Sequence, residues 1–73
     1  MELIKEVQTE LERAVSAYPN FYSAHEGYAI LLEEVDELWD LVKVKQSKHD
    51  KAAMRAEAIQ IAAMAIRFAR DCT

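Results

Sequence analysis

Apolar side chains recur at helical spacing over three stretches of the chain. From Leu3 to Tyr18 they return every three or four positions, while charged and amide side chains fill the other side, as in an amphipathic helix. A second such stretch follows residue 23, and a third, apolar almost all round, follows residue 50. We therefore predict an all-α fold of three helices, over residues 2–18, 23–46 and 50–71, within a single domain of residues 1–73.

Local signals place the ends of these helices. Pro19 ends the first one, since proline disfavours helical geometry in the residue before it. Ser23 and Glu26 form a capping box at the start of the second helix. The third is capped by Ser47 or Asp50. The glutamates of the first helix are expected to face solvent and are assigned no chemistry: Glu2, Glu6, Glu10 and Glu12.

One glycine and four aromatic residues lie in or beside the second predicted helix. Glycine inside a helix costs about 1 kcal/mol relative to Ala, so close approach of another helix or of a ligand should account for Gly27. We interpret Phe21 and Tyr22 as a hydrophobic staple in preference to base-stacking groups. Tyr28 and Trp39 lie away from the acidic flank of this helix, and we expect them to pack it against the first helix or a partner chain.

A cluster of carboxylates lies on one flank of the second predicted helix. Because residues three and four apart are neighbours on a helix, Glu33, Glu34 and Glu37 gather their charges there. Three like charges this close repel unless water, a basic side chain or a cation separates them, and Mg²⁺ and Ca²⁺ are bound by such oxygen ligands. By itself, a Glu-rich flank is usually the solvated face of a helix.

Polar residues of the third predicted helix add a second observation. Between residues 56 and 69 only Glu57, Gln60 and Arg67 interrupt its apolar surface, and all three fall within a narrow sector. Burying a lone carboxylate is costly unless it is paired or coordinates a metal. A cation held between the two helices is one solution for Glu57. For Arg67 we expect an ion pair with Glu57 or with an acid of a partner helix, in preference to a phosphate contact.

These residues carry a resemblance to a known superfamily. Glu-Glu-x-x-Glu on one helix, followed some twenty residues later by a Glu-x-x-(acid) pair that opens an apolar helix, resembles the MazG-type all-α nucleotide pyrophosphohydrolases. The superfamily also includes dimeric dUTPases and phosphoribosyl-ATP pyrophosphohydrolase. The resemblance covers about residues 23–71.

The resemblance implies roles for particular residues. Glu34, Glu37, Glu57 and Gln60 would ligate Mg²⁺, with Mn²⁺ as an alternative, and Glu33 would orient or deprotonate the attacking water. The family places Asp at position 60. Gln60 offers an amide oxygen without charge, so the site loses one of four formal negative charges.

The implied function is Mg²⁺-dependent hydrolysis of a nucleoside triphosphate to the monophosphate and pyrophosphate, as in house-cleaning of the nucleotide pool. The departure at Gln60 favours an alternative: a catalytically degenerate MazG-like helical bundle that acts as a binding or structural oligomerisation module. A purely structural helical oligomer, with Glu57 paired across an interface, is a further alternative.

Composition adds expectations about partners and location. The chain of 73 residues is 52% apolar, more apolar surface than three helices can cover, which argues for a homodimer or homotetramer. A net charge of −4 disfavours nucleic-acid binding.

No apolar run is long enough to span a membrane, and the N-terminus lacks the layout of a signal peptide. Cys72 is the only cysteine, which excludes a disulfide within the chain and favours a reducing compartment, the cytoplasm.

Overall fold

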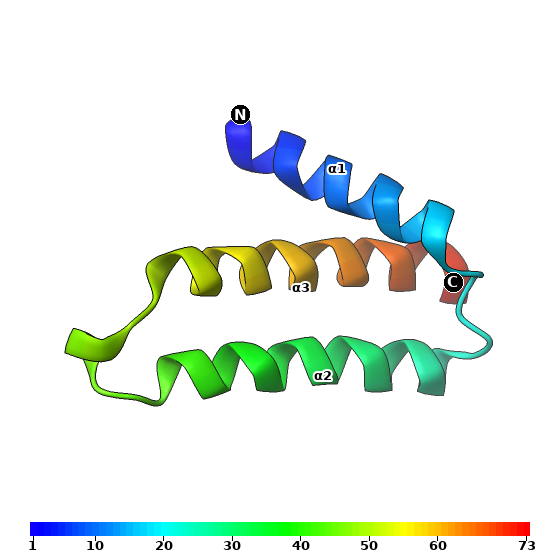
Figure 1. Cartoon of the computed structure of the whole chain (residues 1–73). Coiled ribbons are helices and arrows are strands. Elements are labelled where there is room, and N and C mark those ends of the chain that lie inside the picture. Colours follow the sequence, from blue (N-terminus) through cyan, green and yellow to red (C-terminus); the bar gives the residue numbers. More distant parts are fainter.

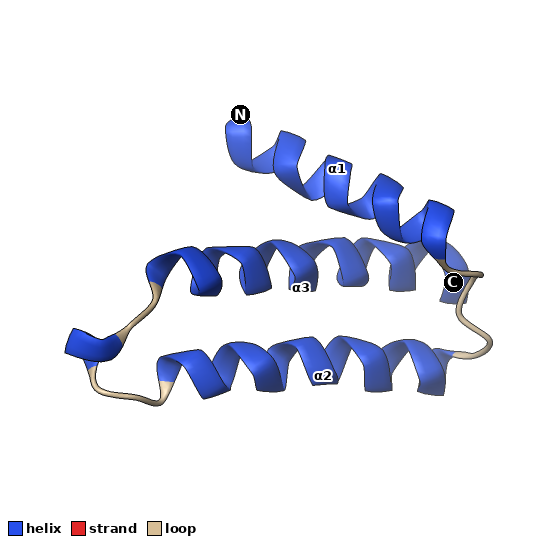
Figure 2. Ribbon diagram, in the orientation of Figure 1, coloured by secondary structure: helices blue, strands red, loops and turns tan.

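The structure, a computed structural model, describes all 73 residues and contains three α-helices, one short 3₁₀ turn and no strand (Figures 1 and 2). The elements in chain order are α1 (Glu2–Ala17), α2 (Ala24–Val42), the turn η1 (Gln46–Lys48) and α3 (Lys51–Cys72). Helices α2 and α3 form a long antiparallel hairpin, and α1 packs on the opposite side of α3 (Figure 1). The all-α prediction is confirmed.

Side chains cap two of the helices as the sequence indicates. Ser23 Oγ accepts from Glu26 N at 3.1 Å. The Glu26 carboxylate reaches back to Tyr22 N at 2.7 Å, one residue earlier than a capping box requires. At the start of α3, Asp50 Oδ1 accepts from Ala53 N at 3.0 Å. Asp50 is therefore the cap of α3.

Helix α2 is shorter than predicted. It ends at Val42, and the prediction that it extends to residue 46 is wrong. The backbone is already extended at Lys45, with φ −56° and ψ 141°. His49 Nε2 lies 2.9 Å from the carbonyl oxygen of Val42, so the imidazole satisfies a carbonyl that another helical turn would otherwise use.

The core lies where α1, α3 and the α1–α2 connection meet. Ala63 is 0% exposed and allows the other elements to approach α3 closely. Phe21 and Met64 fill the space beside it. Partly buried side chains from all three helices pack around this centre: Val7, Leu11, Ile30, Leu31, Phe68 and Cys72. None of the three helices combines the length and apolar character that crossing a bilayer requires.

The last two turns of α3 hold the α1–α2 connection in place. Four hydrogen bonds do so: Arg67 Nη2 to Pro19 O (3.0 Å), Arg70 Nη2 to Asn20 Oδ1 (2.9 Å), Phe21 N to Asp71 Oδ2 (3.1 Å) and Cys72 Sγ to Ser23 O (3.7 Å). As a result Phe21 points inward and is 7% exposed, whereas Tyr22 is 92% exposed. The packing role predicted for both aromatics is right for Phe21 and wrong for Tyr22.

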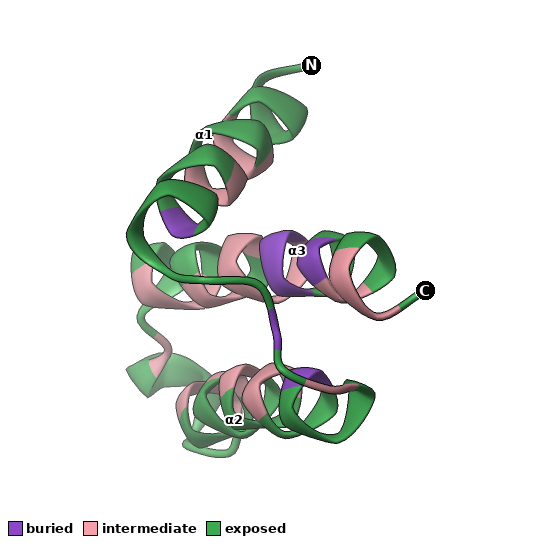
Figure 3. Ribbon diagram, turned by 90° about the vertical axis from the view of Figure 1, so that its right-hand side faces the viewer, coloured by how far each residue is buried: buried purple, intermediate pink, exposed green.

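An apolar stripe on α2 remains uncovered. It consists of Tyr28, Leu32, Val35 and Trp39, which are 41% to 60% exposed, and is called the α2 stripe below. The prediction that Tyr28 and Trp39 pack α2 against α1 is wrong, because α1 lies across α3 instead (Figure 3).

Gly27 lies where α3 and the connection come closest to α2. A Cβ atom at this position would lie 2.8 Å from Phe68 Cδ2, 3.0 Å from Phe21 Cδ2 and 3.2 Å from Cys72 Sγ. Two of the three atoms belong to α3, so the expected close approach of another helix is confirmed.

We predict that Gly27→Ala destabilises the protein by up to about 2 kcal/mol. Overpacking typically costs about 1–3 kcal/mol, and the better helix propensity of Ala offsets about 1 kcal/mol of it. Urea unfolding followed by circular dichroism measures the change. Phe68→Leu in the Gly27→Ala background should recover part of the loss, and a more stable Gly27→Ala protein would contradict the close packing.

Candidate functional site

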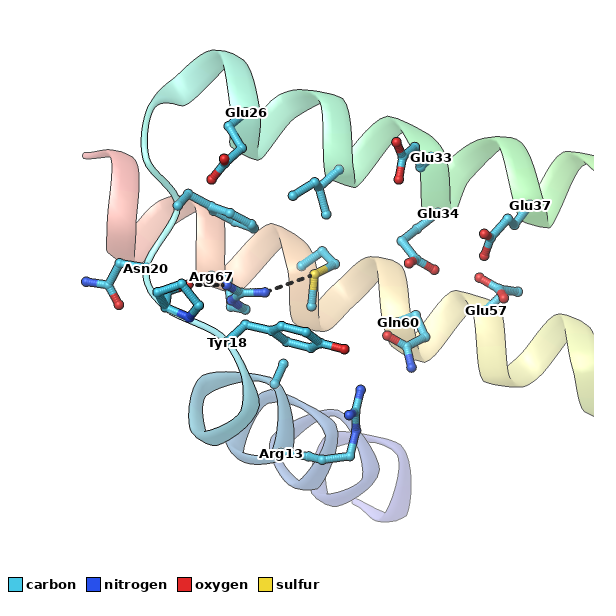
Figure 4. A pocket seen from close by; sticks show the side chains of 15 residues that line it. Arg13, Tyr18, Asn20, Glu26, Glu33, Glu34, Glu37, Glu57, Gln60 and Arg67 are labelled. Atoms are coloured by element: carbon cyan, nitrogen blue, oxygen red, sulfur yellow. Dashed lines mark hydrogen bonds between the residues drawn. The ribbon is translucent and has the colours of Figure 1, made fainter.

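Three carboxylates from two helices converge beside the α2–α3 groove. Glu34 and Glu37 lie one turn apart on α2, and Glu57 faces them from the second turn of α3 (Figure 4). One oxygen from each residue lies within 4.8 Å of the others. We call this group the carboxylate triad. The sequence predicted that these three side chains share a cleft, and the structure brings them together.

No basic side chain compensates the triad. The four ion pairs of the structure are Arg13–Glu10, Lys43–Asp40, Arg55–Glu6 and Arg70–Asp71, and none includes a triad residue. Burial, followed by the hydrogen bond to Glu57 and the charge of Glu37, raises the pKa of Glu34 to about 7. The charge of Glu57 is the main reason why the pKa of Glu37 is also raised. Without a proton or a cation the triad is electrostatically strained.

One oxygen of the triad lacks any partner. Glu57 Oε2 is buried and makes no hydrogen bond. A buried polar atom without a partner costs about 1–3 kcal/mol, and more when it is charged. Such an atom in a folded protein calls for an explanation, and a cation at the triad would provide one.

A cavity of about 550 Å³ extends from the triad toward the α1–α2 connection. Volumes of this size are typical of small-molecule sites. One end is acidic, with Glu33 at its exposed rim beside Glu34 and Glu37. The other end is formed by Pro19, Phe21, Ile30, Met64 and Arg67.

Gln60 lines the same cavity one turn beyond Glu57, between the triad and α1 (Figure 4). Gln60 also lowers the pKa of Glu10 on α1, to a smaller extent than Arg13 does. The roles of Gln60 as a metal ligand and of Glu33 as a base stay predictions.

Arg67 does not pair with Glu57, so the ion pair expected for it is wrong. The two residues share a sector of α3, but ten residues of helix separate them by about 15 Å along the axis. The Arg67 side chain is 4% exposed, and its guanidinium lies 4.2 Å from the centre of the Phe21 ring. It stands at the end of the cavity opposite the triad (Figure 4).

Helix α1 contributes residues that the sequence reasoning missed. Arg13 and Tyr18 line the cavity, and the hydrogen bond to Glu10 is the main reason why the pKa of Arg13 is raised. The Glu10 side chain is only 17% exposed, so the expectation that it faces solvent is wrong. The only local signal was the i, i+3 spacing of Glu10 and Arg13, which is common on solvated helix faces.

No protein-family model, no curated protein and no solved structure matches this chain. The triad and the cavity are therefore the features of the chain that indicate a function.

We predict that the metal-free protein becomes less stable as the pH rises from about 5 to about 8. The pKa of Glu34 is raised from 4.5 to about 7 in the folded state. Its contribution to stability is thus fully present below about pH 4.5 and is lost as the pH rises through about 7. Thermal melts in the presence of a chelator should show this slope as a melting temperature that falls with rising pH.

Two variants identify the group responsible for this dependence of stability on pH. Glu34→Gln, a neutral replacement of similar shape, should flatten the slope, and Asp36→Asn, on the exposed side of the same helix, should leave it unchanged. An unaltered slope in Glu34→Gln would show that the triad is not the source.

Proposed function

We propose that this protein is a Mg²⁺-dependent nucleoside triphosphate pyrophosphohydrolase of the MazG-like kind, which releases the monophosphate and pyrophosphate. The observation that carries the proposal is the carboxylate triad: three acidic side chains from two helices, without a basic partner, at one end of a cavity of about 550 Å³. Such an arrangement is costly to fold unless a ligand compensates it.

The donor atoms of the triad suit a hard divalent cation. All three residues offer carboxylate oxygens, and oxygen ligands favour Mg²⁺, Ca²⁺ or Mn²⁺ over zinc. Mg²⁺ usually keeps several waters and takes only one or two protein carboxylates together with substrate phosphates. A cation would also give the buried Glu57 Oε2 the partner that it lacks. Glu34, Glu37 and Glu57 are thus the residues that would hold it.

The cavity provides room for a nucleotide beside the cation. When bound, Mg²⁺ supplies neutralisation of phosphate charge and activation of water. Glu33, exposed at the rim of the cavity, is the residue that we assign to orient that water or accept its proton. No cysteine, serine or histidine lines the cavity, in agreement with direct attack by water. The lone Cys72 favours action in a reducing compartment, the cytoplasm.

The degenerate helical bundle is the competing function, and Gln60 is the residue that favours it. An amide at this position leaves three formal negative charges where the family has four. If that loss abolishes catalysis, the protein still folds and binds cations without turning over nucleotides.

We predict Mg²⁺-dependent release of pyrophosphate from one or more nucleoside triphosphates, canonical or modified. Glu37→Gln should reduce the rate at least about 100-fold, because it removes one ligand of the cation that would stabilise transition-state charge. Ion chromatography of monophosphate and pyrophosphate measures both products.

Gln60→Asp separates the two functions. Activity gained only in this variant would support the degenerate bundle with an undercharged site. If wild type, Glu37→Gln and Gln60→Asp all release no pyrophosphate, the enzyme proposal fails.

We further propose that the chain acts as a homodimer joined through the α2 stripe. The accessible surface is 5365 Å², whereas a compact monomer of this mass exposes about 4,600 Å². The difference is close to the roughly 800 Å² that each partner buries in a standard interface. The stripe lies away from the cavity, so a second copy covers it without closing the site.

We predict that Leu32→Arg, in the middle of the α2 stripe, shifts the protein from dimer to monomer, because the interface would bury an unpaired charge. Sedimentation velocity over a concentration series measures the change. Gln8→Arg adds the same charge on the exposed side of α1 and should leave the dimer intact. A wild-type protein that sediments as a monomer at all concentrations would refute the dimer.

A further inference from the structure

Arg67 is a buried cation that belongs to none of the four ion pairs of the chain. Asp71, whose pKa Arg67 helps to lower, already accepts hydrogen bonds from Arg70 and from Phe21 N. A guanidinium carries five N–H donors and no acceptor. One donor goes to Pro19 O and one to the weak acceptor Met64 Sδ, which leaves three donors free, including the buried Nε.

The surroundings of Arg67 are mainly apolar. Phe21 stacks on the guanidinium, and Ile30, Met64 and Pro19 line the same cavity. Asn20 also lines it, with its side chain bound by Arg70. Glu26 is the one carboxylate at this end (Figure 4), and it accepts a hydrogen bond from Tyr22 N. This end therefore combines the free donors of one planar cation with mainly apolar walls.

We propose that the Arg67 end of the cavity binds the nucleobase of the substrate, and that Arg67 selects bases with a carbonyl oxygen over adenine. The inference rests on the proposed function for the place of the phosphates, which the triad holds at the other end. A carbonyl oxygen accepts from the guanidinium, as in the recognition of guanine by arginine. The amino group of adenine is a hydrogen-bond donor at the same position. It would face the N–H donors of Arg67 and leave them without an acceptor.

A base fits this end better than a phosphate does. A single buried cation between apolar walls compensates only part of the charge of a phosphate, and the rest would be desolvated at high cost. A neutral planar ring with an acceptor at its edge instead matches both the apolar walls and the free donors. The distance of about 15 Å along α3 between Glu57 and Arg67 also separates this end from the triad.

Inosine and adenosine nucleotides provide a matched test, since their bases differ only in the oxo or amino group at one ring carbon and in the hydrogen that the adjacent ring nitrogen carries in the oxo form. Calorimetric titration of the wild-type protein with inosine and adenosine monophosphate, in a chelator, needs neither metal nor turnover. We expect the inosine nucleotide to bind roughly ten- to a hundredfold more tightly, the effect of one hydrogen bond to a charged group.

Two variants assign the preference to Arg67. Arg67→Gln can still donate to Pro19 O but loses the charged fork, and it should bind both nucleotides equally. Arg70→Gln removes a neighbouring cation that anchors the same connection from outside the cavity, and it should keep the preference. Should Arg67→Gln fail to fold, equal binding of the two nucleotides by the wild-type protein would still refute the proposal.

Inorganic tripolyphosphate with Mg²⁺ tests the other end of the cavity by its effect on thermal stability. We expect Arg67→Gln to retain this stabilisation, and its loss would assign Arg67 to phosphate and overturn the proposal. Equal binding of the two monophosphates to wild type, or binding of neither, would also overturn it. If the monophosphates are discriminated but neither triphosphate is hydrolysed, the base site stands and the hydrolase proposal fails.

Discussion

Helix α3 is the element on which the rest of the structure depends, because both other helices pack against it. One sector of α3 provides the small and flexible core residues Ala63 and Met64. The same side of the helix carries Glu57, Gln60 and Arg67 into the cavity. The distance between Glu57 and the acids of α2 is therefore set by the register of the α2–α3 hairpin. That register is held at one end by the contact of Gly27 with Phe68 and at the other by His49 on the carbonyl of Val42.

The three features that violate ordinary folding rules all lie in one cavity. Glu34 has a raised pKa, Glu57 has a buried oxygen without a partner, and Arg67 is a buried cation that forms no ion pair. Each costs stability in the unliganded chain. In a small domain with six buried residues such costs are not easily absorbed. Their concentration at opposite ends of one cavity points to a ligand that compensates both.

The helices and the two triad residues of α2 were predictable from the sequence because their causes are local. Apolar spacing indicated three helices, and Ser23 and Asp50 cap backbone groups within three residues. Glu34 and Glu37 share a flank through one helical turn. The end of α2 was missed because it depends on His49, seven residues along the chain. The contribution of α1 to the cavity follows from its crossing of α3, which no local spacing encodes. Arg67 was misplaced because periodicity gives the direction of a side chain but not its distance along the axis from a partner.

Charge counting gives Gln60 a role beyond that of a missing ligand. In the proposed site, three carboxylates and one divalent cation leave a single negative charge. A fourth carboxylate would leave two negative charges and would favour a second cation. Gln60 instead lines the cavity beside the triad without adding to the repulsion. Under the proposed function, the uncharged amide therefore suits a site for one cation.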